Sequence, residues 1–136
     1  MITLETKYQG ELRAVSKHVR SGTELITDAP VDNEGKGASF SPTDLLATAL
    51  GTCMITVMGI AARKHRINID GARLEIVKLM SLQPRKVSAI QINILMPDIH
   101  YSEEERQILE VAGTTCPVAL SLHPDLKQDI HFIYKF

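Results

Sequence analysis

Apolar residues alternate with polar ones near the start of the chain, and this pattern predicts β-strands. The period of two runs over residues 2–8, and further strands are expected over residues 12–19 and 24–27, the last two separated by the turn Ser21-Gly22. A loop with proline, asparagine and two glycines follows over residues 29–40. The first quarter of the chain therefore predicts a small antiparallel sheet that leads into an irregular segment.

The same alternation returns in the second half of the chain. A strand is expected over residues 74–82, a turn over 83–86, and a second strand over 90–94, where isoleucines alternate with polar residues. The last strand is expected over residues 130–136. These strands predict a second sheet with one buried face and one face exposed to water.

Between the two groups of strands lies a long apolar segment. Residues 45–62 contain no charged residue, and the segment opens with Ser41-Pro42-Thr43-Asp44. Serine as N-cap, proline at the first helical position and a carboxylate three residues after the cap predict a helix start. The helix is expected to run from Pro42 to about Arg66, with basic residues near its end that complement the helix dipole.

This helix predicts a buried core element rather than a membrane span. Threonines and glycines dilute its apolar character, and neither a second span nor an aromatic belt accompanies it. On a helical wheel Ala47, Gly51 and Met58 form a side that permits close approach of another helix, such as one from a second subunit, while Cys53 lies on a different side. We therefore expect an oligomer.

Two shorter helices are expected near the C-terminal strand. A capping box over residues 102–105 predicts a helix to about Ala112, with Gly113 as its C-cap, and Cys116-Pro117 starts a short helix that ends at Ser121. The predicted fold class is α+β, a single domain over residues 1–136 with mainly antiparallel strands around a long buried central helix.

Composition and motif content argue against several classes of function. The 136 residues carry 15 basic and 16 acidic side chains, a net charge of −1, which disfavours a nucleic-acid-binding surface. No secretory signal is visible at the N-terminus, so a reducing cytoplasmic location is expected. The five histidines lack metal-ligand spacing and no phosphate-binding glycine motif is present, so we expect neither a metal nor a nucleotide cofactor.

The two cysteines are the residues with the clearest capacity for chemistry. Cys116 precedes Pro117, so it is expected at a helix N-cap, where the dipole favours a thiolate. Cys53 lies mid-helix among aliphatic residues, an environment that favours an inert thiol. The alternative is that each is a small apolar core residue, an interpretation that the sequence favours for Cys53 more than for Cys116. If they meet, a sulfenic acid on one would condense with the other. The candidate cations for a thiolate are Arg13, Lys17, Arg20, Arg63 and Arg85.

Two motifs resemble the family of osmotically inducible and organic hydroperoxide resistance proteins, the OsmC/Ohr family. They are Ser41-Pro42-Thr43-Asp44-Leu45-Leu46-Ala47 followed by Leu50-Gly51-Thr52-Cys53, and Thr115-Cys116-Pro117-Val118 with Leu120. The order of strands and helices matches as well, so the resemblance covers essentially the whole chain. It implies an intertwined homodimer with two central helices packed together and active sites at the subunit interface.

The resemblance also implies a thiol peroxidase and reverses the ranking of the cysteines. Cys53 would attack an organic hydroperoxide or hydrogen peroxide, Cys116 would resolve the sulfenic acid as a disulfide, and an external dithiol would reduce it. Arg13, with Arg20 as the alternative, matches the arginine that activates the thiolate. Organic hydroperoxide resistance members carry a glutamate that orients this arginine where this chain has Thr43. The chain therefore resembles an OsmC-like subgroup in which another group orients the arginine.

Two other functions follow from the same residues. Thr43 is compatible with a binding protein that kept the fold without peroxidase turnover, and a reversible disulfide is compatible with a redox sensor. Retained apolar ligand with unreactive thiols would favour the first. Oxidation that changes partner affinity without turnover would favour the second.

Overall fold

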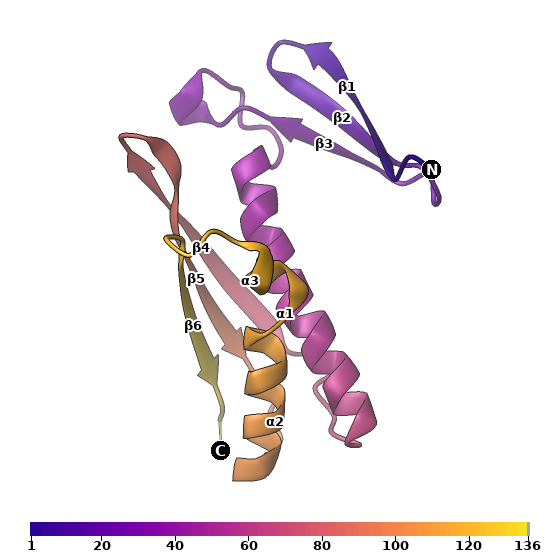
Figure 1. Cartoon of the computed structure of the whole chain (residues 1–136), viewed down its shortest axis with the longest axis vertical. Helices are drawn as coiled ribbons and strands as arrows, with labels where there is room; N and C mark the ends of the chain where they lie inside the picture. Colours follow the sequence, from indigo (N-terminus) through magenta and orange to yellow (C-terminus); the bar gives the residue numbers. More distant parts are fainter. Residues whose placement is uncertain (136) are drawn as a thin grey trace. The chain divides into compact units, whose positions relative to one another are not determined.

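The computed structural model describes residues 1–135 and divides into two compact units, Met1–Leu46 and the residues from Ala47 onward. The first unit contains β1 (Leu4–Gly10), β2 (Arg13–His18) and β3 (Glu24–Asp28), an antiparallel sheet in the order β1-β2-β3 (Figure 1). This confirms the three strands predicted from the alternation of apolar and polar residues.

The loop after β3 is organised by backbone hydrogen bonds. It contains the short 3-10 helix η1 (Val31–Asn33), and the amides of Gly35 and Gly37 donate to the carbonyls of Pro30 and Ala29. A Cβ atom on Gly35 would lie 1.7 Å from the Ala29 carbonyl oxygen. Glycine is therefore required at this position because the backbone turns back on itself.

Helix α1 (Pro42–Lys64) begins at the predicted capping motif. The Ser41 hydroxyl accepts a hydrogen bond from the Asp44 amide at 3.0 Å, and the Ser41 amide donates to Oδ2 of Asp44 at 3.0 Å. This is a reciprocal capping box with aspartate in the position where glutamate is common. The helix ends two residues before the predicted Arg66, which has a positive φ of 56°.

The second unit holds the sheet β4-β5-β6. Strands β4 (Arg73–Leu82) and β5 (Arg85–Leu95) are antiparallel, as expected, whereas β6 (Lys127–Ile133) runs parallel to β5. The crossover that parallel pairing requires contains α2 (Glu103–Thr114) and α3 (Pro117–Ser121).

The last strand begins and ends earlier than predicted. It stops at Ile133 because the next side chain turns to α2: the Tyr134 hydroxyl donates to Oε2 of Glu110 at 2.7 Å, and the Arg106 guanidinium lies 4.1 Å from the ring centroid. The predicted end at Phe136 lies outside the described residues.

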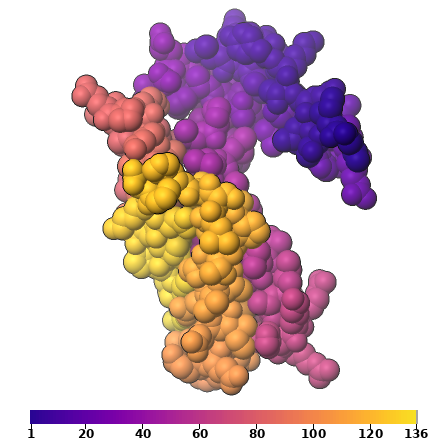
Figure 2. Space-filling model, viewed as in Figure 1, coloured from indigo at the N-terminus to yellow at the C-terminus, as the bar shows by residue number. Residues whose placement is uncertain are grey.

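One face of this sheet forms the core with α1 and α2. Ile90, Ile92 and Ile94 of β5 are fully buried, as are Met54 and Met58 of α1. In the ribbon view α1 and α2 run side by side over the sheet, and in the space-filling view the orange atoms of α2 lie directly against the magenta atoms of α1 (Figures 1 and 2).

Two glycines have different roles from those predicted. Gly51 packs against the chain's own sheet rather than against another subunit's helix, since a Cβ there would lie 2.5 Å from Cδ1 of Ile76 in β4. Gly113 lies inside α2 instead of capping it, and Thr115 is the C-cap. A Cβ on Gly113 would lie 3.0 Å from Sδ of Met58, so this glycine allows α2 to approach α1 closely.

The side of α1 that faces away from the core is partly exposed, so the expectation of a helix buried on every side is wrong for the single chain. By length and composition α1 could cross a membrane, yet only 33% of its most apolar 18-residue stretch is buried within this chain. Ala47, Leu50 and Met58 face the core, while Ile60 is 52% exposed and Val57 is half-buried. An apolar helix face therefore remains uncovered in the single chain.

Candidate active site

Cys53 lies in the middle of α1, on the side that the core leaves partly open. Its side chain is half-buried, and so are those of Ala49 and Val57, one helical turn before and after it. The predicted environment among aliphatic residues is correct, but the thiol is not enclosed. A partly exposed sulfur can be reached by a small reactant from solvent.

Cys116 is fully buried and caps α3. Its Sγ accepts a hydrogen bond from the Ala119 amide at 3.4 Å, and Pro117 occupies the first helical position. Both features were predicted from the Cys-Pro pair.

The predicted preference of Cys116 for a thiolate is wrong. Burial raises the pKa of the Cys116 thiol, and although the amides of Ala119 and Val118 oppose this rise, they do not reverse it. Loss of hydration outweighs the dipole of a helix of only five residues. Cys116 is therefore a protonated thiol at neutral pH, which removes the physical reason for ranking it as the attacking group.

The fold brings the two cysteines together within the second unit. The Cys53 thiol is close enough to raise the pKa of Cys116 further, through a side-chain hydrogen bond and through charge repulsion. Both cysteines are free and no disulfide joins them. The two sulfurs, 63 positions apart in sequence, thus influence each other but do not lie at disulfide distance, and one is half-buried while the other is enclosed.

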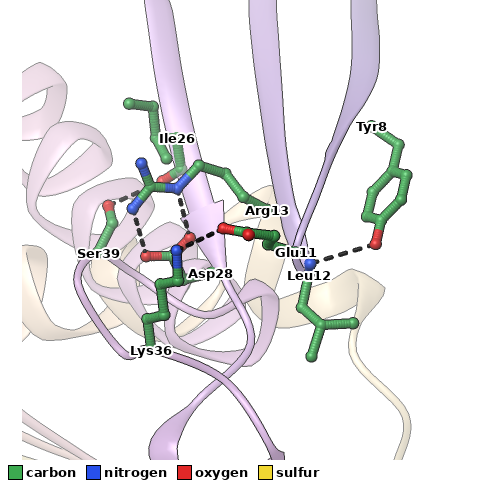
Figure 3. Close-up of polar contacts among 8 residues, drawn as sticks. All are labelled: Tyr8, Glu11, Leu12, Arg13, Ile26, Asp28, Lys36 and Ser39. Carbon is green, nitrogen blue, oxygen red and sulfur yellow. Dashed lines mark hydrogen bonds and ion pairs between the residues drawn. The ribbon is translucent and has the colours of Figure 1, made fainter.

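Arg13 lies in the first unit and is held by Asp28, the residue directly opposite it across β2 and β3 (Figure 3). Its Nε lies 2.7 Å from Oδ1 of Asp28 and its Nη2 lies 2.9 Å from Oδ2. The guanidinium lowers the pKa of the Asp28 carboxyl, chiefly through this hydrogen bond, and the carboxylate raises the pKa of Arg13 in return.

Arg20, the alternative cation, is placed differently from Arg13. It lies in the turn between β2 and β3 and is exposed. The structure thus pairs Arg13 with a carboxylate in the first unit, and Cys53 with Cys116 in the second.

The sequence reasoning missed Asp28, the partner of Arg13. The signal was available in the register of the second hairpin, because the turn at Ser21-Gly22 places Arg13 opposite Asp28 and Lys17 opposite Glu24. Two such pairs of opposite charge on neighbouring strands are typical of an antiparallel sheet. Among residues 1–135, no group of three or more histidine, cysteine or acidic side chains is arranged to hold a metal ion.

Comparison with known proteins places this geometry in context. The model of the family described as OsmC-like protein matches residues 35–131. A crystal structure of a proposed osmotic stress induced and detoxification response protein from Psychrobacter arcticus 273-4 is 46% identical, with a TM-score of 0.93 over 98% of this chain and 96% of that one. No relative was found among curated proteins.

More distant solved structures share the fold. An organic hydroperoxide resistance protein OsmC from Legionella pneumophila is 14% identical, with a TM-score of 0.72 over 97% of each chain. The organic hydroperoxide resistance protein OhrB of Bacillus subtilis is 12% identical, with a TM-score of 0.65 over 96% of each chain.

Proposed function

Because the chain belongs to the family of OsmC-like proteins, we propose that it is a thiol-dependent peroxidase that reduces organic hydroperoxides or hydrogen peroxide. The observation that supports this most directly is the pair of free thiols, Cys53 and Cys116, brought within interaction range from distant parts of the chain. A half-buried sulfur beside an enclosed one suits a sequence of attack followed by resolution.

In the first step Cys53 attacks as a thiolate. Its Sγ forms a bond to the terminal oxygen of the peroxide, and the O–O bond breaks. The leaving oxygen takes up a proton, which gives an alcohol from an organic hydroperoxide or water from hydrogen peroxide. The sulfur is oxidised by two electrons to a sulfenic acid, and the peroxide is reduced by the same two electrons.

In the second step Cys116 resolves the sulfenic acid. The Cys116 sulfur attacks Sγ of Cys53, the S–O bond breaks, and the hydroxide leaves as water with the proton from the Cys116 thiol. The product is a Cys53–Cys116 disulfide. An external dithiol then reduces this disulfide by two successive exchanges and restores both thiols.

Arg13 is the residue we assign to the stabilisation of the Cys53 thiolate in the assembled protein. A guanidinium is always protonated at physiological pH and offers several donors to an anion. In this proposal Arg13 also contacts the peroxide oxygen on which negative charge develops as the O–O bond breaks. Arg20 is the alternative candidate for this role. It differs from Arg13 because it is exposed in a turn, whereas Arg13 is held by a carboxylate.

We also propose that the functional unit is a homodimer in the cytoplasm. The uncovered apolar side of α1, which includes Ile60 and the half-buried Val57, is the surface that a second copy would bury.

Turnover by single-cysteine variants tests the proposal. With dithiothreitol as the reductant, the wild-type protein is expected to consume cumene hydroperoxide over many turnovers, and Cys53→Ser to consume it at the background rate. Cys116→Ser is expected to reduce its first equivalent and to accumulate a sulfenic acid that dimedone traps. Equal rates for wild type and Cys53→Ser would contradict the proposal.

Intact mass provides the matching chemical readout. A slight excess of hydroperoxide without reductant is expected to remove both free thiols and lower the wild-type mass by about 2 Da, the two hydrogens lost when a disulfide forms. Oxidation to higher sulfur acids without loss of the second thiol would contradict the resolving role of Cys116.

A second function is favoured by Thr43, which stands where the organic hydroperoxide resistance proteins of the resemblance carry a glutamate. Its hydroxyl lies 3.1 Å from the Ser41 hydroxyl at the start of α1. A protein without that glutamate suits redox sensing or ligand binding. Disulfide formation that changes partner affinity but gives no multiple turnover would support this alternative.

A further inference from the structure

We propose that Gln128 is the positioning residue for the resolving step, an inference that rests on the proposed function. In this proposal Gln128 holds the end of α3, and α3 in turn keeps the Cys116 sulfur directed at Cys53. Gln128 contacts neither sulfur and acts only through Ala119. All four residues belong to the second unit.

The first argument is the place of a polar side chain on an apolar face. Gln128, Ile130 and Phe132 alternate along β6, and their partners in register are the three fully buried isoleucines of β5. A half-buried amide in such a row costs free energy unless it finds a hydrogen-bond partner. Nε2 of Gln128 donates to the Ala119 carbonyl at 2.9 Å, so this partner lies in α3 rather than in the sheet.

The second argument is that the Ala119 carbonyl needs a partner from outside its helix. The last carbonyls of a helix have no amide of that helix to accept from, and α3 has only five residues. Ala119 is also buried, which leaves little access for water. The side chain of Gln128 therefore satisfies this carbonyl and fixes the end of α3 to β6.

The third argument is that both peptide groups of Ala119 are engaged at once. Its carbonyl accepts from Gln128, and its amide donates to Sγ of Cys116 at 3.4 Å. The Cys116 sulfur in turn lies within interaction range of Cys53. A continuous chain of contacts therefore runs from the side chain of Gln128 to the pair of sulfurs.

The resolving step depends on this arrangement because the two sulfurs are free and do not lie at disulfide distance. Sγ of Cys116 must approach Sγ of Cys53 opposite the S–O bond that breaks, and the hydroxide leaves as water. A thiol at the start of a helix that is fixed at its end has less orientational freedom to lose before this attack. The amide of Ala119 also opposes the rise in the pKa of Cys116 that burial causes, so a loosened α3 would supply less thiolate.

The test measures attack and resolution separately in Gln128→Leu. Gln91→Leu is the control, because it makes the same change at an exposed position on the neighbouring strand β5. One equivalent of cumene hydroperoxide is added to the reduced protein with excess dimedone, which competes with Cys116 for the Cys53 sulfenic acid. Intact mass gives the fraction labelled by dimedone, peroxide consumption gives the rate of attack, and circular dichroism verifies folding.

Gln128→Leu is expected to slow resolution about tenfold, because the attacking thiol is no longer held in position. The fraction labelled by dimedone should rise toward that of Cys116→Ser, while the rate of attack stays unchanged. Gln91→Leu is expected to leave both quantities at their wild-type values. Gln128→Glu keeps the size of the side chain but has no N–H donor, so it should behave as Gln128→Leu does, and it decides the assignment if Gln128→Leu does not fold.

Three outcomes would overturn the assignment of Gln128. They are an unchanged labelled fraction in a folded Gln128 variant, an equal rise in Gln91→Leu, and a slowing of attack as large as the slowing of resolution.

A wild-type protein that consumes no peroxide would overturn the proposed peroxidase function instead, and the thiol oxidant diamide then tests Gln128 separately. Cys53 adds to the N=N bond of diamide, Cys116 displaces the adduct to form the disulfide, and diamide is reduced by two electrons to the hydrazine. Bridging is expected to be slower in Gln128→Leu than in Gln91→Leu, and equal rates would overturn the role of Gln128.

Discussion

At the scale of single residues, the burial of each cysteine determines its chemical character more than its position in a helix does. The Cys-Pro pair predicted the N-cap of α3 correctly, because proline at the first helical position is a local signal. The raised pKa of Cys116 was not predictable, since it depends on complete burial by residues distant in sequence. Asp28 was missed for a related reason: its partner is a cross-strand neighbour 15 residues away.

The Arg13–Asp28 pair makes acid stability a residue-level prediction. The folded-state pKa of Asp28 is lower than its ordinary value of 3.8, so the unfolded chain binds the proton more tightly. The stabilisation is therefore complete above that ordinary value and is lost as the pH falls through the lower, folded-state pKa. Asp28→Asn is expected to be less stable than wild type at pH 6, and the difference is expected to shrink toward pH 2.

Urea unfolding at a series of pH values measures this difference. Asp98→Asn serves as the control, because Asp98 is 64% exposed and its ion pair with Lys135 is screened by solvent. A gap between wild type and Asp28→Asn that stays constant from pH 6 to pH 2 would show that the carboxylate gains nothing from Arg13 on folding.

At the scale of elements, the sequence predicted the six strands and the three α-helices of the described residues but not the short helix η1, and the largest errors lie where tertiary contacts set the structure. The start of α1 was set by the Ser41–Asp44 capping box and the start of α2 by Ser102 and Glu105, which are local interactions. The parallel pairing of β6, its early end and the packing role of Gly113 all depend on α2, so no local pattern contained them.

Removal of the α1 cap gives an element-level prediction. Ser41→Ala deletes the acceptor of the Asp44 amide and is expected to lower the free energy of unfolding by about 1 kcal/mol. Asp44→Asn keeps an oxygen that accepts from the Ser41 amide and loses only the favourable charge near the dipole, so a smaller loss is expected. Chemical denaturation measures both, and equal losses would mean that the serine hydroxyl is not the stabilising part of the cap.

At the scale of the whole molecule, the main question is what covers the open side of α1. A chain of 136 residues has few elements with which to surround so apolar a helix, and α2 and the sheet cover one side only. The sequence already predicted an oligomer on this ground, but it assigned the wrong side of the helix. Ala47, Gly51 and Met58 face the chain's own core, and the uncovered side includes Ile60.

A charge on that side should therefore separate the subunits. Ile60→Glu is expected to convert a wild-type dimer to a monomer, because it would place two unpaired carboxylates in an apolar interface. Val77→Glu is the control, since Val77 is 50% exposed but lies on β4 opposite Gln91, on the outward face of the sheet. Size-exclusion chromatography with light scattering measures both, and a monomeric wild-type protein would contradict the dimer.

The enclosure of Cys116 also determines how the proposed catalytic cycle is reset. Once a bridge joins the two sulfurs, an incoming reductant can approach from solvent only on the side of Cys53, because Cys116 has no exposed surface. The transient adduct with the reductant must then form on Cys53, and Cys116 departs as the released thiol. In the proposed cycle the deeper cysteine is in this way shielded from reductant and peroxide in the surrounding solution.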